Sequence, residues 1–274
     1  MIAANHSSSA KSFIVRRIFR IYPTYWLSIL IVVSVIAVQI IITGYNSSAV
    51  LPKSPVAVLQ TLMLLIEPTS GVKAINWVYW SLTYEVCFYI VMFIYLLFPK
   101  NIRFFWLLII SVLAILLPKH GNWLFFFITH WPSFLLGIAI FNLNTYKKTK
   151  IVETTLLLVL SSLGLFINTE NPSIYSIVCF FVGFLLILNT FYTLPKNYFS
   201  KYGDSSYSIY LIHVPIGIYL FRMFGPIKIV QENLIIHILW DILIYIVIVV
   251  ISRFIYIKFE NPAIQYGKKI SKSL

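Results

Sequence analysis

Charged residues are scarce in this chain, and acidic residues are the scarcest. Asp and Glu number 8 among 274 residues, against 21 Lys and Arg, and only 11% of all residues are charged. A soluble domain averages about 25% charged residues and about 45–50% apolar ones. Here 60% of residues are hydrophobic, and the mean hydropathy is +0.90. The composition therefore excludes a water-soluble domain and predicts an integral membrane protein.

Cysteine and the motifs of soluble enzymes are also nearly absent. The two cysteines, Cys87 and Cys179, lie inside apolar runs, so we expect neither a disulfide framework nor a bound metal. The sequence contains no glycine-rich phosphate loop, no HExxH and no GxSxG motif. The first residues, MIAANHSSSAKS, lack the apolar core of a cleavable signal peptide. These absences favour a path or a reaction centre within the membrane.

Long apolar runs recur along the whole chain. A membrane-spanning helix needs about 20 apolar residues, and the alternation typical of a β-barrel is missing, which leaves a helical bundle. The candidate spans are 23–43, 77–98, 104–118, 123–143, 151–168, 173–192, 206–224 and 234–257. The run 56–67 is too short to span and is expected to be an interfacial or re-entrant helix. We predict an all-α, polytopic membrane bundle of about eight transmembrane helices, forming one domain over residues 1–274.

The distribution of Lys and Arg predicts the orientation of this bundle. With a cytoplasmic N-terminus, sixteen basic residues fall on the cytoplasmic side and five on the other. Such an excess is typical of the cytoplasmic side of membrane proteins, and it accounts for the net charge of +13 without a nucleic-acid partner. Both termini are therefore expected in the cytoplasm. The Lys-, Asn- and Ile-rich composition suggests a bacterial source, so we expect a multi-pass protein of the bacterial cytoplasmic membrane.

Two ionisable side chains fall well inside predicted spans. A charge at the centre of a spanning helix costs about 2.5–3.5 kcal/mol, so each such residue is a functional candidate. Glu85 follows Ser81 by four residues and shares its helix face. It is either a reacting group or a hydrogen-bonded link between helices. His213 follows Tyr210 by three residues and precedes Pro215, which frees a backbone carbonyl in the preceding turn.

Other polar residues have simpler interpretations. His237 and Asp241 are four residues apart and are expected to form a local ion pair. His130 precedes Pro132 near an outer membrane face and receives no assigned role. Asp204 and Ser205 are expected to cap the helix that follows them, with their side-chain oxygens accepting from free backbone N–H groups.

A basic cluster, Arg16, Arg17 and Arg20, precedes the first predicted span. Basic residues at this position attract anionic lipid headgroups, each for about 1 kcal/mol. The alternative is a phosphate-rich ligand, because arginine makes planar, bidentate contacts with phosphate. Arg16 and Arg20 are one helical turn apart and are spaced to hold one ligand together.

Five stretches, in order along the chain, resemble the membrane acyltransferase-3 family. They are FIVRRIFRIYPTYW, WSLTYEVCFYIVMFIYLLFP, PSFLLGIAIF, GDSSYSIYLIHVPI and FENPAIQYGKK. The resemblance covers nearly the whole chain. It implies a bundle of about ten helices that transfers acyl groups, often acetyl, from cytoplasmic acyl-CoA to hydroxyls of surface carbohydrates such as O-antigen, capsule, exopolysaccharide or peptidoglycan. The implied partners are the lipid bilayer, acyl-CoA (acetyl-CoA is the expected donor) and a carbohydrate acceptor, and a separate protein that supplies or receives the acyl group stays open.

The family's motifs assign roles to single residues of this sequence. The basic cluster, with Arg17 and Arg20 in the family's cytoplasmic motif, is expected to bind CoA. Trp80, Ser81 and Glu85 match the family's Trp-Ser-Leu-x-x-Glu segment. Ser206, Tyr207, Tyr210 and His213 match its Ser-Tyr-x-x-Tyr-x-x-His segment, and Glu260 matches its closing Glu-x-Pro. From these matches we expect Glu85 and His213 to be catalytic and the remaining residues to bind or support substrate.

The chain also departs from the family pattern. In the family, two helices precede the basic motif, and the first carries the His regarded as catalytic. Here fifteen residues precede Arg16, so the sequence resembles the family without those two helices. Three hypotheses stay open: an acyltransferase that uses His213 or Glu85 as its base, an inactive truncated remnant, and a transporter or flippase for a glycan or lipid-linked sugar. No inverted repeat of the kind common in transporters is visible.

Overall fold

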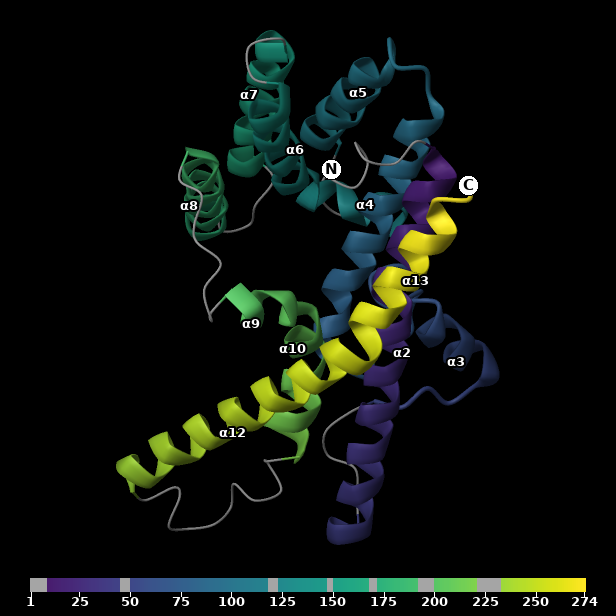
Figure 1. Ribbon diagram of the computed structural model, residues 1–274, viewed down its shortest axis with the longest axis vertical. Coiled ribbons are helices and arrows are strands. Elements are labelled where there is room, and N and C mark those ends of the chain that lie inside the picture. Colours follow the sequence, from purple (N-terminus) through teal and green to yellow (C-terminus); the bar gives the residue numbers. More distant parts are fainter. Residues whose placement is uncertain are drawn as a thin grey trace. The chain divides into compact units, whose positions relative to one another are not determined.

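The structure is a computed structural model whose regular elements are all helical over the described residues (Figure 1). It describes residues 9–44, 50–117, 123–146, 150–167, 172–191, 200–220 and 233–274. Over these ranges, four stretches are long and apolar enough to cross a membrane, namely Ala10–Thr43, Trp77–Leu97, Phe126–Tyr146 and Leu234–Ser271. Shorter apolar helices cover 103–116, 151–167 and 174–188. The protein is therefore a helical, multi-pass membrane protein.

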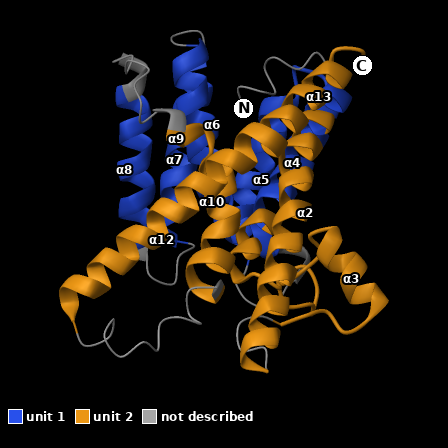
Figure 2. Cartoon of the chain, turned by 60° about the horizontal axis from the view of Figure 1, so that its bottom comes forward, with its two compact units in different colours: residues 1–14, 84–195, 274 blue, residues 15–83, 196–273 orange. Residues whose placement is uncertain are grey.

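Contacts between residues divide the chain into two units (Figure 2). Unit 1 comprises Met1–Ile14, Tyr84–Pro195 and Leu274, and unit 2 comprises Val15–Thr83 and Lys196–Ser273. Two helices continue from one unit into the other, α2 (Ala10–Thr43) and α4 (Trp80–Leu97).

Unit 1 is a bundle of apolar helices around buried aromatic and aliphatic side chains. Besides most of α4 it contains α5 (Arg103–Leu116), a 3₁₀ segment (Trp123–His130), α6 (Trp131–Tyr146), α7 (Ile151–Ile167) and α8 (Pro172–Phe191). Its core includes Met92, Leu107, Trp131, Ala139 and Leu157. The indole N–H of Trp131 donates to the hydroxyl of Ser111 at 3.0 Å, which satisfies the polar atom of a fully buried ring.

Unit 2 contains the remaining helices. After most of α2 come α3 (Pro55–Leu62), a 3₁₀ turn (Trp77–Tyr79), α9 (Ser200–Asp204) and α10 (Ser206–Ile212). A π-helical stretch (His213–Leu220) extends α10. The C-terminal part is α12 (Leu234–Ile255), a second π-helical stretch (Tyr256–Glu260) and α13 (Asn261–Ser271), which follow one another without a break.

The first helix begins earlier than predicted. The expected span started at Pro23, whereas α2 runs from Ala10 with Pro23 inside it. Proline within a helix removes one backbone hydrogen bond, and spanning helices tolerate this loss. With 34 residues, α2 is about 51 Å long, well beyond the roughly 30 Å of a hydrocarbon core. The basic cluster therefore lies in the first turns of the same helix that forms the span.

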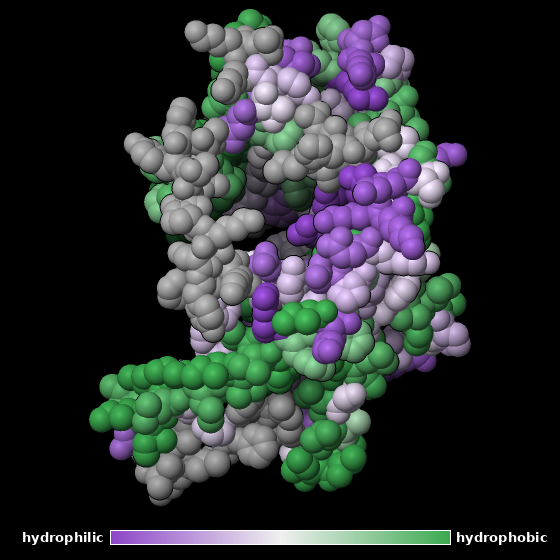
Figure 3. All heavy atoms as spheres, viewed as in Figure 1, coloured by the Kyte–Doolittle hydropathy of each residue, from purple (hydrophilic) through white to green (hydrophobic). Residues whose placement is uncertain are grey.

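Exposed apolar side chains mark the lipid-facing surface. They include Leu234, Ile235, Leu239, Ile242 and Val250 along α12, and this helix shows a continuous hydrophobic face in Figure 3. Hydrophilic side chains gather instead over α13, whose last turn carries Lys268 and Lys269 (Figure 3). The change from an apolar to a polar surface indicates that α12 lies in the membrane and that α13 lies at its edge.

The short helix α3 is fastened to α2 by its C-terminal carbonyl groups. The last carbonyls of any helix lack donors within the helix, and side chains of α2 supply them here. Tyr25 donates to the carbonyl of Thr61 at 2.6 Å, Trp26 to that of Leu62 at 3.0 Å, and Tyr22 to that of Met63 at 3.2 Å. The helix has 8 residues and is too short to span, as the sequence predicted.

Tyr25→Phe should destabilise the protein more than Tyr22→Phe does. Tyr25 is fully buried, so its loss removes a buried hydrogen bond and leaves the carbonyl of Thr61 with backbone donors such as the N–H of Leu64, at a cost of about 0.5–1.5 kcal/mol. The bond from Tyr22 is exposed, and water replaces it. Thermal unfolding in detergent measures both variants, and equal losses would contradict the assigned role of the Tyr25 hydroxyl.

Candidate functional site

The candidate site in unit 2 is organised by the helix that runs from α10 into its π-helical extension. Pro215 has no N–H, so the carbonyl of Leu211, four residues earlier, receives no bond from it. The side-chain amide of Asn76 donates to this carbonyl at 3.1 Å. Asn76 is fully buried, and its side-chain oxygen, Oδ1, accepts from the backbone N–H of Val78 at 3.4 Å. The carbonyl that the sequence expected Pro215 to free is therefore bonded by Asn76, the residue that precedes the 3₁₀ turn before α4.

His213 begins the π-helical stretch, and its ring is held in one tautomer. Its Nδ1 lies 2.8 Å from the carbonyl of Tyr210 and 3.2 Å from that of Ile209. Carbonyl oxygens only accept hydrogen bonds, so Nδ1 carries the proton. In the neutral ring Nε2 then has the lone pair, and no described residue bonds to it. His213 is half-buried and has the form of a hydrogen-bond acceptor or a base at Nε2.

One turn before His213, Tyr210 joins α10 to the start of α4. Its hydroxyl lies 2.6 Å from the Ser81 hydroxyl and donates to the carbonyl of Val78. The Ser81 hydroxyl also lies 3.4 Å from the carbonyl of Val78, so the two hydroxyls share this acceptor and either one can donate to the other. The predicted support residues Ser81 and Tyr210 are therefore brought together, and the backbone carbonyl that orients His213 belongs to the same tyrosine.

Glu260 approaches α10 from the second π-helical stretch. Its carboxylate accepts from the hydroxyl of Ser208 at 2.6 Å, and only 2% of its surface is exposed. Arg20 lies close enough for its positive charge to act on this carboxylate. A buried carboxylate is stable only when hydrogen-bonded or paired, so Ser208 and Arg20 together hold Glu260 in place. Ser208 carries this contact although sequence reasoning did not single it out.

Arg16 is fixed by the C-terminal helix. Its Nε donates to the hydroxyl of Ser271 at 2.7 Å, which leaves its two terminal nitrogens without a partner among the described residues. The approach of α13 to α2 requires Gly267, because a Cβ there would lie 2.5 Å from Cβ of Phe19. Tyr207 links α10 to the same helix, because its hydroxyl donates to the carbonyl of Ile21 on α2 at 3.0 Å.

The arginines of the basic cluster present different surfaces. Arg20 is exposed, whereas Arg16 and Arg17 are half-buried. A guanidinium held at Nε keeps its two terminal groups for a planar, bidentate contact, and an exposed guanidinium one turn away adds a second charge. This arrangement suits a ligand with more than one phosphate. Among the described residues, no group of three His, Cys, Asp or Glu side chains is placed to hold a metal ion.

Some predicted site residues lie outside this network. Ser206 is exposed, and Trp80 is 45% exposed. Glu85 belongs to unit 1, where the hydroxyl of Tyr89 donates to its carboxylate. Tyr89 lies on the same helix, α4, so this contact does not link two helices, and both interpretations of Glu85 stay open.

Two further expectations from the sequence have clear outcomes. The expected pair His237 and Asp241 is present with Nε2 and Oδ2 3.7 Å apart, and both side chains are exposed. The capping role expected of Ser205 is wrong. Its hydroxyl donates to the carbonyl of Tyr202 at 3.1 Å and makes no bond to the N–H groups of α10, because a 3₁₀-like turn brings that carbonyl within reach.

Asn76→Ala should destabilise the protein by about 1–3 kcal/mol, because the carbonyl of Leu211 would lose its donor inside the protein. In a Pro215→Ala background the restored N–H of residue 215 supplies a replacement donor, so the same substitution should cost clearly less. A double-mutant cycle of unfolding free energies in detergent measures this coupling. Equal losses of unfolding free energy on Asn76→Ala in both backgrounds would contradict the inference that Asn76 replaces the donor that Pro215 lacks.

Comparison with protein families identifies one match. The model of the acyltransferase-3 family, described as an acyltransferase domain, matches residues 3–257. No curated protein and no solved structure matches the chain. The matched range includes the basic cluster, Ser81, Tyr210 and His213, whereas Glu260 and Ser271 lie beyond its end.

Proposed function

The chain belongs to the acyltransferase-3 family, and we propose that it moves an acyl group from cytoplasmic acyl-CoA to a hydroxyl of a cell-surface or exported carbohydrate. Family membership indicates acyltransferase activity in a helical membrane protein. The donor, the acceptor and the residue roles are our proposal. Acetyl-CoA is the expected donor, and the cytoplasmic membrane of a bacterium is the expected location.

The observation that carries the proposal is the line of hydrogen-bonded polar groups along α10. Ser208 contacts Glu260, Tyr210 contacts Ser81, and His213 follows with its Nδ1 against the carbonyl of Tyr210. From Ser206 to His213 the helix rises by about 11 Å. Polar groups spread along this helix, together with the basic cluster in the first turns of α2, suit a charged donor that binds at the membrane surface while its acyl arm reaches inward.

The basic cluster is the proposed site for the phosphates of CoA. Arg16 offers its two terminal nitrogens while Ser271 fixes its Nε. Arg20 offers an exposed charge, which also acts at a distance on the carboxylate of Glu260. Arg17 supplies the third charge. The positive-inside distribution of Lys and Arg puts this cluster on the cytoplasmic side, where acyl-CoA is found.

His213 is the proposed base. The acceptor hydroxyl oxygen attacks the thioester carbonyl carbon while its proton passes to Nε2 of His213, and the bond from that carbon to the CoA sulfur breaks. The proton then moves from His213 to the CoA thiolate, which leaves a carbohydrate ester and free CoA. The bond from Nδ1 to the carbonyl of Tyr210 stabilises the protonated ring and holds its orientation. Glu85 is the second candidate for the base.

Arg20→Ala and Arg17→Ala should each weaken binding of acetyl-CoA by about tenfold or more, because each removes a charge-assisted hydrogen bond. Arg20→Lys should recover only part of the affinity, since an ammonium makes no bidentate contact. Calorimetric titration of the detergent-solubilised protein measures these affinities. Lys258→Ala serves as a control, because it removes an exposed positive charge outside the cluster. Unchanged affinity in the arginine variants would overturn this donor site.

His213→Ala should lower transfer of labelled acetyl groups to carbohydrate by about 10²–10⁴-fold while leaving acetyl-CoA affinity unchanged. Glu85→Gln tests the second candidate in the same assay. Full acetyl transfer by both variants would contradict the assignment of His213 or Glu85 as the base. If the wild-type protein transfers no acetyl group but moves a lipid-linked sugar across vesicle membranes, the transporter hypothesis replaces this one. If the wild-type protein shows neither acetyl transfer nor sugar transport, the hypothesis of an inactive remnant is favoured.

A further inference from the structure

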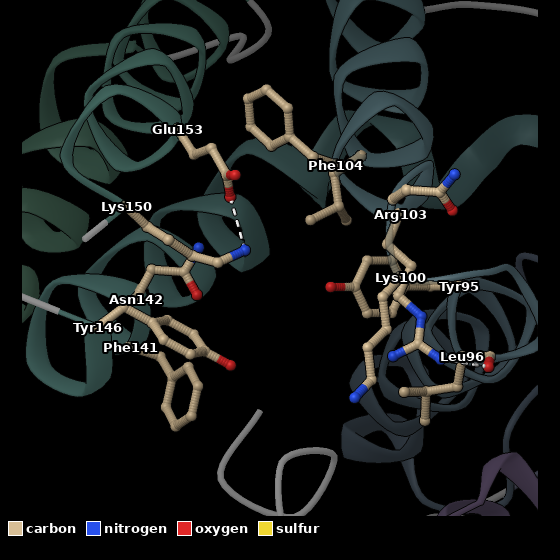
Figure 4. A pocket seen from close by; sticks show the side chains of 12 residues that line it. Tyr95, Leu96, Lys100, Arg103, Phe104, Phe141, Asn142, Tyr146, Lys150 and Glu153 are labelled. Carbon is tan, nitrogen blue, oxygen red and sulfur yellow. Dashed lines mark hydrogen bonds and ion pairs between the residues drawn. The ribbon is translucent and has the colours of Figure 1, made fainter.

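A pocket of about 220 Å³ lies in unit 1, at the meeting point of four helix ends. One wall consists of the end of α4, the turn after it and the start of α5, and the other consists of the end of α6 and the start of α7 (Figure 4). Its volume is below the roughly 300 Å³ at which pockets for drug-sized ligands begin. The pocket therefore suits a small group, or the end of a longer molecule.

The charge of this pocket is strongly positive. Lys100, Arg103 and Lys150 line it, against the single carboxylate of Glu153. Lys150 is paired with Glu153 at 2.9 Å, and this hydrogen bond raises the pKa of Lys150. Over the residues that the structure describes, the Lys100 ammonium has no hydrogen-bond or ion-pair partner. Two positive charges thus remain uncompensated, and an anion is the ligand that would compensate them.

Arg103 is held rigidly at the mouth of the pocket. Its Nε donates to the carbonyl of Phe98 and its Nη2 to that of Leu96, both at 2.9 Å. These bonds also satisfy carbonyls where α4 ends. Arg103 begins α5 and Lys150 precedes α7, and helix N-termini carry partial positive charge that favours an anion further.

Neutral hydrogen-bond donors complete the lining. In Figure 4 the hydroxyls of Tyr95 and Tyr146 point into the opening from opposite walls, and the ammonium groups of Lys100 and Lys150 do the same. The amide of Asn142 lies beside them and is buried. Cations together with hydroxyl and amide donors around a small space make a site for a phosphate group, whose oxygens each accept several hydrogen bonds.

The surroundings of the pocket indicate where this phosphate comes from. Large apolar side chains on the same helix ends are exposed, with exposed fractions of 62% for Leu97, 61% for Phe105 and 70% for Val152. In a membrane protein such side chains face acyl chains. A soluble phosphate would make no contact with these apolar side chains, whereas a phospholipid carries acyl chains that would pack against them. Basic pockets between helices at the cytoplasmic surface are typical sites for anionic lipid headgroups.

We propose that this pocket binds the phosphate headgroup of an anionic phospholipid, whose acyl chains lie against the exposed apolar side chains of α4, α5 and α7. The headgroup compensates Lys100 and Arg103 on one wall and lies opposite the Lys150–Glu153 pair on the other, so that it joins the two walls. The site belongs to unit 1 alone and does not depend on the proposed transfer reaction.

The test measures lipid retention by the full-length protein. Native mass spectrometry of the detergent-solubilised protein, with phosphatidylglycerol or phosphatidylcholine added, should show one preferentially retained phosphatidylglycerol. The double variant Lys100→Gln/Lys150→Gln should retain it at least fivefold more weakly for each lysine removed. Glu153→Gln should act in the opposite direction and strengthen retention, because it removes the opposing carboxylate. Lys100→Arg/Lys150→Arg should retain the lipid like the wild type, which separates lost charge from misfolding.

Three results would overturn the proposal. The first is equal lipid loss in Lys269→Gln, which removes an exposed lysine from α13 in the other unit. The second is binding of soluble glycerol 3-phosphate or inorganic phosphate as tightly as phosphatidylglycerol, which would assign the pocket to a free phosphate. The third is loss of acetyl-CoA affinity in the double glutamine variant with lipid retention unchanged, which would assign the pocket to the acyl donor.

Discussion

The hydrogen bond from Asn76 to the carbonyl of Leu211 is the contact on which the candidate site depends. Pro215 removes the donor that a regular helix would supply, and a membrane interior has no water to replace it. The amide of Asn76 compensates this loss and ties the start of α4 to α10. The same proline coincides with the change from α- to π-helix at His213. Helix segments of this kind are common at functional sites, because they redirect side chains and carbonyl groups.

Two carbonyl groups of the turn before the proline, those of Ile209 and Tyr210, face Nδ1 of His213, and that of Leu211 accepts from Asn76. Tyr210 uses its backbone carbonyl to fix the tautomer of His213 and its hydroxyl to contact Ser81. A single residue thereby links the position of α4 to the tautomer of the histidine. A second π-helical stretch, which ends at Glu260, places a buried carboxylate next to Ser208. The irregular helix segments of unit 2 thus coincide with its buried polar contacts.

In the two proposals, positive charge has a different role in each unit. In unit 2, arginines lie on one helix, where Ser271 orients Arg16 and Glu260 attracts Arg20. Arginine suits the multidentate recognition of a phosphate-rich donor. In unit 1, two lysines with Arg103 surround a small pocket with an apolar rim. Lysine acts there as a point charge at the membrane surface. The proposed ligands differ accordingly, a soluble nucleotide-like donor in the first case and a lipid headgroup in the second.

The sequence by itself determined the class of protein and much of its helical layout. Apolar runs of about 20 residues are long enough to cross a membrane, and their length can be read directly from the sequence. The predicted spans 77–98 and 151–168 therefore closely match helices of the structure. Motif order also identified the family, and with it His213 and the basic cluster. The sequence further predicted that Pro215 frees a carbonyl, because that effect is local to one helical turn.

Only the tertiary structure decided which residues complete these local features. Asn76 and Leu211 are 135 residues apart, and Arg16 and Ser271 are 255 apart, so no local pattern links them. The tautomer of His213 depends on where two carbonyls point, and the cavity in unit 1 exists because four helix ends meet. Residue types fix which groups need a partner, because a buried polar atom must be bonded. Which partner it finds is decided by packing, because helix faces distant in sequence become neighbours only in the folded chain.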